Sequence, residues 1–494
     1  MSGDGVTSTS YSVRRLTANA SAALVGEAVS KGAAFVATVL VARSVSAVEF
    51  GQFSFVLALV SFALLASDVG LQVTATRAVA ADRARGAEYA TASMVIGTLV
   101  GAALYVGVVV LAALDGLPAG TAGAAVVFGA VLVLAGPINA WWSFLRGFER
   151  QDLVYGVYAI SAIALVVSIA AVVQSDPSLE ELFAIYLLAY GVRLALSLLA
   201  VRRVAPIRVR LTRPAFTSLL VAAPAVALAY GLQEVYSHVD VVLLGFLVPA
   251  ADVGSYAAAY RLIDAVTFLS AGALSAATFP VFSRLARDAP NQIERLYDQA
   301  IRVLTAVLVP LVLLLMIVAP PLVDWLYSFE SGTAARILTL LAPSALLIAL
   351  NFTTMYFLLA VNRVDIAIAG AGAGAIVNIV CNVAAVPLVG VEAAAAATFV
   401  GECVVVAAYA VGLGRTGFST HAPRAVMVAA IALIPPIALA VAVPSQRVVL
   451  LLLGIPFAMV VMLAGRVIRT AEVRQLIRAL RSGRPTERMS DAAG

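Results

Sequence analysis

The chain has 494 residues, of which 62% are hydrophobic and only 12% are charged, and its formal net charge is +5. A soluble globular chain has about 25% charged and about 45–50% apolar residues. This composition therefore excludes a soluble enzyme, a nucleic-acid-binding protein and a disordered scaffold.

Apolar runs long enough to cross a bilayer recur along the whole chain. A membrane-spanning helix needs about 20 apolar residues, and only short polar links separate these runs. We therefore predict an all-α polytopic membrane protein with about 14 transmembrane helices. The predicted spans are residues 20–42, 52–76, 90–113, 122–144, 153–173, 182–201, 217–245, 255–280, 300–319, 337–360, 366–386, 393–412, 425–443 and 448–466.

Lysine and arginine are distributed unevenly between the two sides that these spans define. With the N-terminus in the cytoplasm, 26 of the 32 basic residues fall in inner segments, and only Arg43, Arg336 and Arg447 fall in outer ones. Cytoplasmic loops carry an excess of basic residues. We therefore predict a multi-pass protein of the cell membrane with both termini in the cytoplasm.

The first link between spans has a counterpart near the middle of the chain. VSAVEFGQF (45–53) aligns with VPAADVGSY (248–256), and this pairs Gly51 with Gly254. An even number of spans separates the two copies, so they run in the same direction and predict parallel repeats. The predicted parts are an N-terminal six-helix lobe (1–201), a basic cytoplasmic linker (202–216), a C-terminal six-helix lobe (217–412), extra helices 13 and 14 (413–466) and a cytoplasmic tail (467–494).

Ionisable residues within the spans gather in the first two helices of each lobe. Such a group at mid-bilayer costs about 2.5–3.5 kcal/mol and needs a partner or a wet cavity. We therefore predict that spans one, two, seven and eight face a polar cavity between the lobes. The residues are Glu27, Lys31, Asp68, Glu234, His238, Asp240, Arg261 and Asp264. In the other spans, the ionisable residues are Arg193 and Glu402.

Glu27 and Lys31 are spaced i, i+4 with the acid first, which is the favourable order for an ion pair on a helix. The pair either neutralises itself so that the helix can insert, or takes part in substrate or ion binding. The repeat places Lys31 at the same level as Glu234, which suggests a salt bridge that closes the cavity.

The other ionisable residues have different neighbours along the chain. His238 lies four residues after Glu234, which favours either a proton-coupled switch or a hydrogen-bonded interface residue. Arg261 and Asp264 are close enough on one helix to neutralise each other. Asp68 has no basic residue within a turn of its own span, so it needs a partner from elsewhere and is a candidate for protonation or cation binding.

Two blocks of the sequence resemble a known family of transporters. Residues 238–285, HVDVVLLGFLVPAADVGSYAAAYRLIDAVTFLSAGALSAATFPVFSRL, are similar to the second-half signature of the polysaccharide and O-antigen flippases. This family is a branch of the multidrug/oligosaccharidyl-lipid/polysaccharide exporter superfamily. Residues 42–80 resemble its opening pattern of ARxL, acidic turn, FG, apolar helix and DxGL, with DVGL at positions 68–71.

The resemblance implies a V-shaped, two-lobed transporter that moves lipid-linked oligosaccharides from the cytoplasmic to the outer leaflet by alternating access. It implies no enzymatic activity and no cofactor. Helices 13 and 14 either form a groove for the polyprenyl tail, as resemblance to fourteen-helix flippases of peptidoglycan precursors suggests, or are a simple extension. The expected partners are the lipid-linked oligosaccharide, membrane lipids and H⁺ or Na⁺, with no nucleic acid, and we expect a monomer.

A lipid phosphate or pyrophosphate that carries sugars needs a wet, partly cationic cavity for its head. The residues expected to bind it are Lys31, Arg261, His238, Gln233 and Tyr236. Those expected to serve ion coupling or gating are Glu27, Asp68, Glu234, Asp240 and Asp264. No metal site is expected, because no second His or Cys lies at ligand spacing from His238.

Two other functions fit parts of the pattern. The excess of acids over bases among the cavity residues is compatible with a proton- or sodium-driven exporter of drugs or organic cations from the same superfamily. A membrane glycosyltransferase or ligase would carry a catalytic carboxylate cluster or a D-x-D motif in a sizeable outer loop. The outer links are short and carry no such motif, which disfavours the enzyme.

Overall fold

The computed structural model is helical throughout most of the part that it describes. It describes residues 25–327 apart from 69, 207–208, 269, 271–277, 279–280, 283 and 287–288, together with 332–416, 418 and 422–467. The side chains of 225–238, 290–291, 422–423 and 444 lie outside this description, and so does the predicted tail after residue 467.

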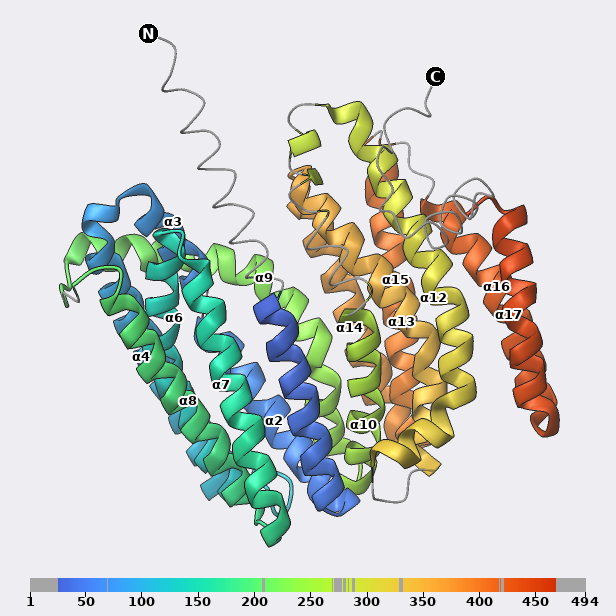
Figure 1. The fold of residues 1–494 in the computed structure, drawn as a ribbon, viewed down its shortest axis with the longest axis horizontal. Helices are drawn as coiled ribbons and strands as arrows, with labels where there is room; N and C mark the ends of the chain where they lie inside the picture. The colour runs from blue at the N-terminus through green and yellow to red at the C-terminus, as the bar shows by residue number, and fades with distance from the viewer. Residues whose placement is uncertain are drawn as a thin grey trace, which may run out of the picture. The chain divides into compact units, whose positions relative to one another are not determined.

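The helices follow one another with short connections (Figure 1). A first helix, Val25–Ser44, precedes the labelled ones. These are α2 (Ala47–Asp68), α3 (Leu71–Ala81), α4 (Gly86–Ala113), α5 (Ala122–Gly129), α6 (Val131–Gly147), α7 (Gln151–Val172), α8 (Leu179–Arg202), α9 (Arg213–Leu247), α10 (Ala250–Thr267), α12 (Pro290–Leu326), α13 (Gly332–Ala360), α14 (Val364–Val389), α15 (Glu392–Arg415), α16 (Ala422–Ala442) and α17 (Arg447–Ala464).

Twelve candidate membrane spans occur among the described residues. They match the predicted spans except the seventh and eighth, which correspond to α9 and to α10 with residues beyond its described end. Helices suit this environment because hydrocarbon offers backbone groups no water to bond with, and a helix satisfies them internally. The prediction of an all-α membrane protein with about 14 transmembrane helices is confirmed.

The chain divides into two compact units. The first comprises residues 1–265, 320–340 and 368–404, and the second comprises 266–319, 341–367 and 405–494. Helices α12 to α15 each contribute residues to both units. The boundaries of the two six-helix lobes and of the linker stay predictions.

Aromatic rings form part of the core of the first unit. Phe183 of α8 stacks on Phe53 of α2 and on Phe128 of α5, with ring centroids 5.0 and 4.9 Å apart. Tyr186 lies one turn further along α8 and contacts the same rings. Such contacts, between rings that are almost fully buried, fix α2, α5 and α8 against one another.

The two glycines that the repeat aligns lie against each other in the first unit. A Cβ added to Gly51 of α2 would overlap the carbonyl of Ala250, and one added to Gly254 of α10 would lie 2.6 Å from the Ala47 oxygen. The first turns of α2 and α10 therefore touch backbone to backbone. Only glycine allows this close approach, because any side chain would occupy the same space.

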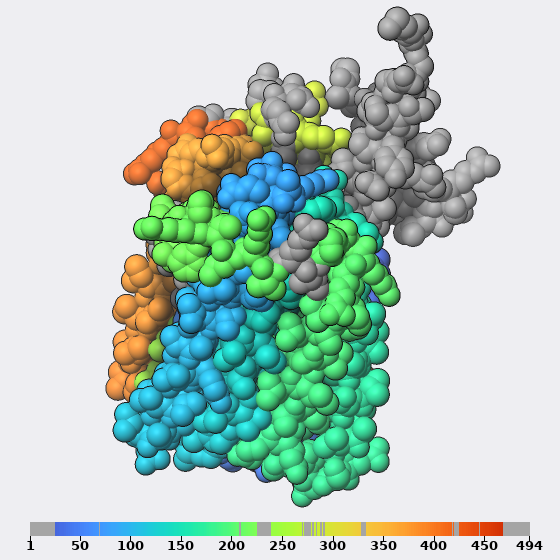
Figure 2. All heavy atoms as spheres, turned by 90° about the vertical axis from the view of Figure 1, so that its left-hand side faces the viewer, coloured from blue at the N-terminus to red at the C-terminus, as the bar shows by residue number. Residues whose placement is uncertain are grey.

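The described part of the basic linker is fixed to the start of α4. Thr212 donates a hydrogen bond to Glu88 at 3.0 Å, and the backbone N–H of Arg210 donates to Thr91 at 3.1 Å. Leu219, at the start of α9, packs with Leu71 of α3. Figure 2 shows the linker and the beginning of α9 in green beside the blue atoms of these helices.

Candidate functional site

A buried carboxylate on α9 is held by side chains from three other helices. Asp240 is 4% exposed. Its Oδ2 accepts hydrogen bonds from the hydroxyls of Tyr256 (α10) and Thr398 (α15) at 2.8 and 3.0 Å. The Nδ2 of Asn382 (α14) lies 3.5 Å from its Oδ1. The carboxylate is thus solvated by neutral groups in place of water.

Two asparagines continue this cluster along one face of α14. Asn378 and Asn382 are both buried, and the Nδ2 of Asn382 donates to the backbone and side-chain oxygens of Asn378 at 3.0 and 3.1 Å. The Oδ1 of Asn382 has no hydrogen-bond partner among the described atoms. A carboxylate beside neutral amide and hydroxyl oxygens is a ligand set that suits a hard cation.

Two further acids lie near this cluster. The charges of Asp240, Asp264 and Glu402 all lie within electrostatic range of the Tyr260 hydroxyl, one turn after Tyr256 on α10. Glu402 is buried, whereas the side chain of Asp264 is 40% exposed. Negative potential is therefore concentrated around this face of α10.

Two cations act on the exposed acid of this group. The guanidinium of Arg261 lies 3.9 Å from the carboxylate of Asp264, and both side chains are more than a third exposed. The charge of Lys31, from the first helix, also lies within electrostatic range of that carboxylate. The structure thus brings Lys31, Arg261 and Asp264 together, as charges that are only partly covered by protein.

Asp68 closes α2 at a break in the second predicted span. The chain turns there through Gly70, whose φ of 71° lies in the left-handed region that glycine adopts readily, and it continues as α3. The Asp68 carboxylate accepts hydrogen bonds from the backbone of Gln72 at 3.3 Å and from Asn139 of α6 at 3.4 Å. Gln72 belongs to the same predicted span as Asp68, whereas Asn139 comes from another one.

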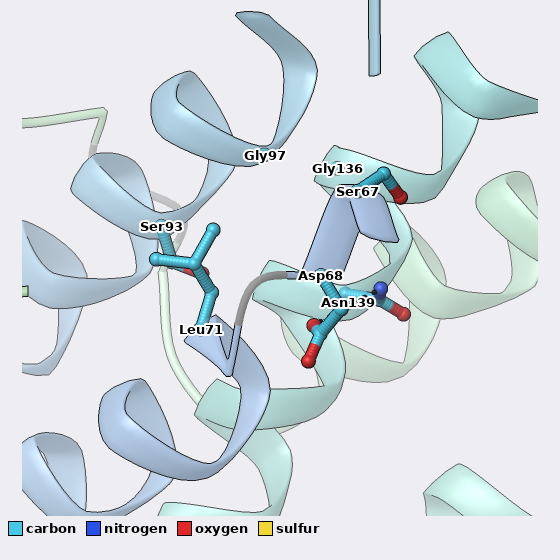
Figure 3. A pocket seen from close by; sticks show the side chains of 7 residues that line it. All are labelled: Ser67, Asp68, Leu71, Ser93, Gly97, Gly136 and Asn139. Carbon is cyan, nitrogen blue, oxygen red and sulfur yellow. Dashed lines mark hydrogen bonds between the residues drawn. The ribbon is translucent and has the colours of Figure 1, made fainter. Parts of the chain in front are cut away.

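Polar side chains surround Asp68 beside a small cavity. The cavity is about 10 Å³, close to the minimum that one water molecule needs, and Figure 3 shows Asp68 and Asn139 at its wall. Gln72 donates to Asn139 at 3.3 Å and accepts from Arg146 of α6. The charge of Arg146 acts on the Asp68 carboxylate, so α2, α3 and α6 share one polar network.

The remaining predicted site residues fall into two groups. Glu27 is exposed, and its charge acts on the Tyr155 hydroxyl of α7, whereas that of Lys31 acts on α10. The other side chains lie outside the described residues, although the backbone of α9 is helical through them. They are Gln233, Glu234, Tyr236 and His238.

Sequence reasoning from ionisable residues missed most neutral members of both networks. Asn378 and Asn382 have a signal that could have found them, because amides spaced i, i+4 in an apolar run need internal partners. Tyr256 stands inside the repeated motif, yet its counterpart Phe53 packs in an apolar core. Nothing local to Asn139 indicates that it meets Asp68, 71 residues away in the chain.

Comparison with protein families finds two models that match parts of the chain. The family model described as "Polysaccharide biosynthesis protein" matches residues 16–286, which is more than half of the chain, and the model MatE matches residues 225–384. A curated relative is the probable low-salt glycan biosynthesis flippase Agl15 of Haloferax volcanii, 24% identical over 164 residues. That match spans 33% of this chain and 34% of the relative.

Solved structures share the fold. The lipid II flippase MurJ in an inward closed conformation has a TM-score of 0.71 at 14% identity, covering 92% of this chain and 99% of that one. An inward-facing multidrug resistance MATE family transporter of the MOP superfamily has a TM-score of 0.64 at 15% identity, covering 78% and 94%. The chain therefore shares the fold of MurJ over nearly all of its length and that of the MATE transporter over most of it.

Proposed function

Because this chain belongs to the polysaccharide biosynthesis protein family, we propose that it is a flippase for a lipid-linked oligosaccharide. It moves the polyprenyl phosphate or pyrophosphate glycan from the cytoplasmic to the outer leaflet of the cell membrane by alternating access. It acts as a monomer, without chemical conversion of the substrate, and both of its termini are cytoplasmic. The strong bias of basic residues toward one side supports this orientation.

The observation that carries the proposal is the group formed by Lys31, Arg261 and Asp264. Partly exposed charges on membrane-spanning helices are tolerated where they face water or a polar ligand. Arg261 and Asp264 are 37% and 40% exposed, so both can meet the head of a substrate. Lys31 and Arg261 bind its phosphate, while Gln233, Tyr236 and His238 contact phosphate or sugars.

The substrate-binding role of Lys31 gives a direct prediction. Lys31→Ala is expected to slow flipping by about tenfold or more, because a hydrogen bond to a charged group is worth about 1.5–3 kcal/mol. Lys31→Arg keeps the charge and should retain most of the activity. The measurement is the transfer rate of a fluorescent lipid-linked oligosaccharide in proteoliposomes.

Arg363→Ala is the matched control, because it removes a cation that is paired with Asp365 and is not among the residues proposed to bind the substrate. Its flipping rate should equal that of the wild type. Wild-type rates for Lys31→Ala and Lys31→Arg alike would remove Lys31 from the substrate site.

We infer that transport is coupled to H⁺ or Na⁺ through buried and half-buried acids. The Asp240 cluster supports this role, since its carboxylate accepts hydrogen bonds from the neutral hydroxyls of Tyr256 and Thr398. The Oδ1 of Asn382 has no hydrogen-bond partner among the described atoms. Asp264 acts with Arg261 and Lys31 in gating. We also place Glu27 and Glu234 in the gate. The repeat puts Glu234 at the level of Lys31, which follows Glu27 by four residues.

Asp68 is the second acid proposed for coupling or gating. Asp68→Asn is expected to alter the dependence of transport on a proton or sodium gradient, because it removes the only charge that opposes Arg146 in the described network. Transport rates with imposed gradients of each ion provide the measurement. Asp152→Asn is the control, because Asp152 is an exposed acid paired with Arg150. If Asp68→Asn left the gradient response unchanged, the role of Asp68 would be structural.

The fold of the MATE transporter and the acids around Tyr260 favour one alternative, an exporter of organic cations. Purified protein in proteoliposomes separates the two functions. A flippase should expose the fluorescent lipid-linked glycan to a membrane-impermeant quencher, with the glycan chemically unchanged. Efflux of ethidium without glycan transfer would instead support the exporter. A protein that showed neither activity would contradict both proposed functions.

A further inference from the structure

Arg193 lies within the membrane-spanning helix α8 and is surrounded by aromatic rings from three helices. Its guanidinium carbon is 4.6 Å from the ring centroid of Tyr190 on α8, 5.2 Å from that of Tyr158 on α7 and 5.9 Å from that of Trp142 on α6. The ring of Trp142 in turn packs on Tyr158, with centroids 4.3 Å apart. We call these three rings the aromatic cage.

The cage leaves most of the hydrogen-bonding capacity of Arg193 unused. Its Nε donates to the hydroxyl of Ser161 at 3.2 Å. Among the described residues, no carboxylate forms an ion pair with it. A guanidinium has five N–H donors, so within the described part of the chain the donors of its two terminal nitrogens remain available. The side chain is partly exposed, which leaves a route for a ligand.

A second arginine makes the same region more positive. Arg146 follows Trp142 by four residues on α6, so both side chains lie on one face of that helix. The charges of Arg146 and Arg193 both lie within electrostatic range of the Tyr158 hydroxyl. Arg146 itself is held by Gln72. Two guanidinium charges therefore act on the cage within membrane-spanning helices, where they would attract an anion.

We propose that Arg193 and the aromatic cage form a binding site for a phosphate or diphosphate group. Arginine binds phosphate through two parallel N–H···O bonds, and the terminal nitrogens of Arg193 can provide both while the rings hold the guanidinium plane. The flanking rings also suit the apolar carbon chain of a prenyl ester. The identification of a prenyl-linked phosphate as the natural ligand rests on the proposed function, whereas phosphate binding itself does not.

The fluorescence of Trp142 tests the site. The chain has three tryptophans, so Trp141→Phe with Trp325→Phe leaves Trp142 as the reporter. Titration with inorganic pyrophosphate and with farnesyl diphosphate should give saturable changes. Arg193→Gln should weaken binding by about tenfold or more, and Arg193→Lys by less, as expected when hydrogen bonds to a charged group are lost.

A second measurement guards against effects of the substitution on Trp142 itself. Each ligand should raise the Tm of the otherwise wild-type protein, because it binds only the folded state, and should raise it less in Arg193→Gln. Arg363→Gln removes an equal charge from the exposed Arg363–Asp365 pair and should behave as the wild type. Tighter binding of farnesyl diphosphate identifies the prenyl ester as the ligand, and equal binding identifies the free phosphate group.

The site would be refuted if the wild type bound neither ligand, or if Arg193→Gln bound both with wild-type affinity and Tm shift. Arg193 would then be a cation that only braces α6, α7 and α8. Flipping assays on the same preparations separate this result from failure of the proposed function. Diphosphate binding without glycan transfer by the wild type would refute the flippase and leave the site in place.

Discussion

Gly51→Leu is expected to abolish transport by preventing the first turns of α2 and α10 from meeting. A Cβ at Gly51 already overlaps the backbone of Ala250, and one at Gly254 lies 3.3 Å from the Cα of Gly51. The obstacle is backbone and cannot move aside as the end of a flexible side chain can. Overpacking of this kind costs about 1–3 kcal/mol, so the two helix ends should stay apart.

The orientation proposed for the chain places this contact at the outer side, so the variant should remain open there. Ser255, next to Gly254, is buried. A cysteine at position 255, in a background without Cys381 and Cys403, should react with a membrane-impermeant maleimide faster when Gly51→Leu is present. The flipping rate in proteoliposomes measures the loss of transport.

Gly107 provides the matched control for this substitution. It lies on α4, and a Cβ there would meet nothing within 4 Å, so Gly107→Leu should keep both wild-type transport and slow labelling. Gly51→Ala should give an intermediate effect. Normal transport by a folded Gly51→Leu protein would show that α2 and α10 need not touch during the cycle.

These glycines also show which part of the fold could be predicted from the sequence. The repeat predicts that Gly51 and Gly254 occupy equivalent places, because the short acidic turns around them align. It does not predict that the two equivalent places meet. Whether they meet depends on the position of the axis that relates the two repeats. Packing throughout the chain sets that position. The helices themselves were predictable, since a length of about 20 apolar residues is imposed by the bilayer.

The partners of Asp68 and those of Asp240 were predictable to different degrees. Desolvation alone identifies Asp68 as a residue in need of a distant partner, and the structure supplies Asn139, 71 residues away in the chain. Which neutral side chains meet a carboxylate depends on the rotation of each helix about its axis. Apolar spans with little periodicity leave that rotation undetermined, so Thr398 could not be assigned to Asp240.

Asp240→Asn is expected to remove ion coupling while leaving the fold intact. A buried carboxylate usually needs a cation to offset its desolvation, yet the described partners of Asp240 are Tyr256, Thr398 and asparagines. The amide that replaces the carboxylate would keep its size and one acceptor without that cost. We therefore expect an unchanged or higher Tm in the absence of coupling ions.

Sodium and pH titrations then distinguish the coupling ion. A ligand present at 100 times its Kd stabilises a folded protein by about 2.7 kcal/mol, so Na⁺ should raise the Tm of the wild type and not that of Asp240→Asn. If H⁺ is the ion, the wild type alone should show transport driven by a pH gradient. Asp365→Asn removes an exposed carboxylate paired with Arg363 and should retain the wild-type response. If Asp240→Asn kept the gradient response, the Asp240 carboxylate would be excluded from coupling. An amide does not take up a proton near neutral pH, and it has no negative charge to bind a cation.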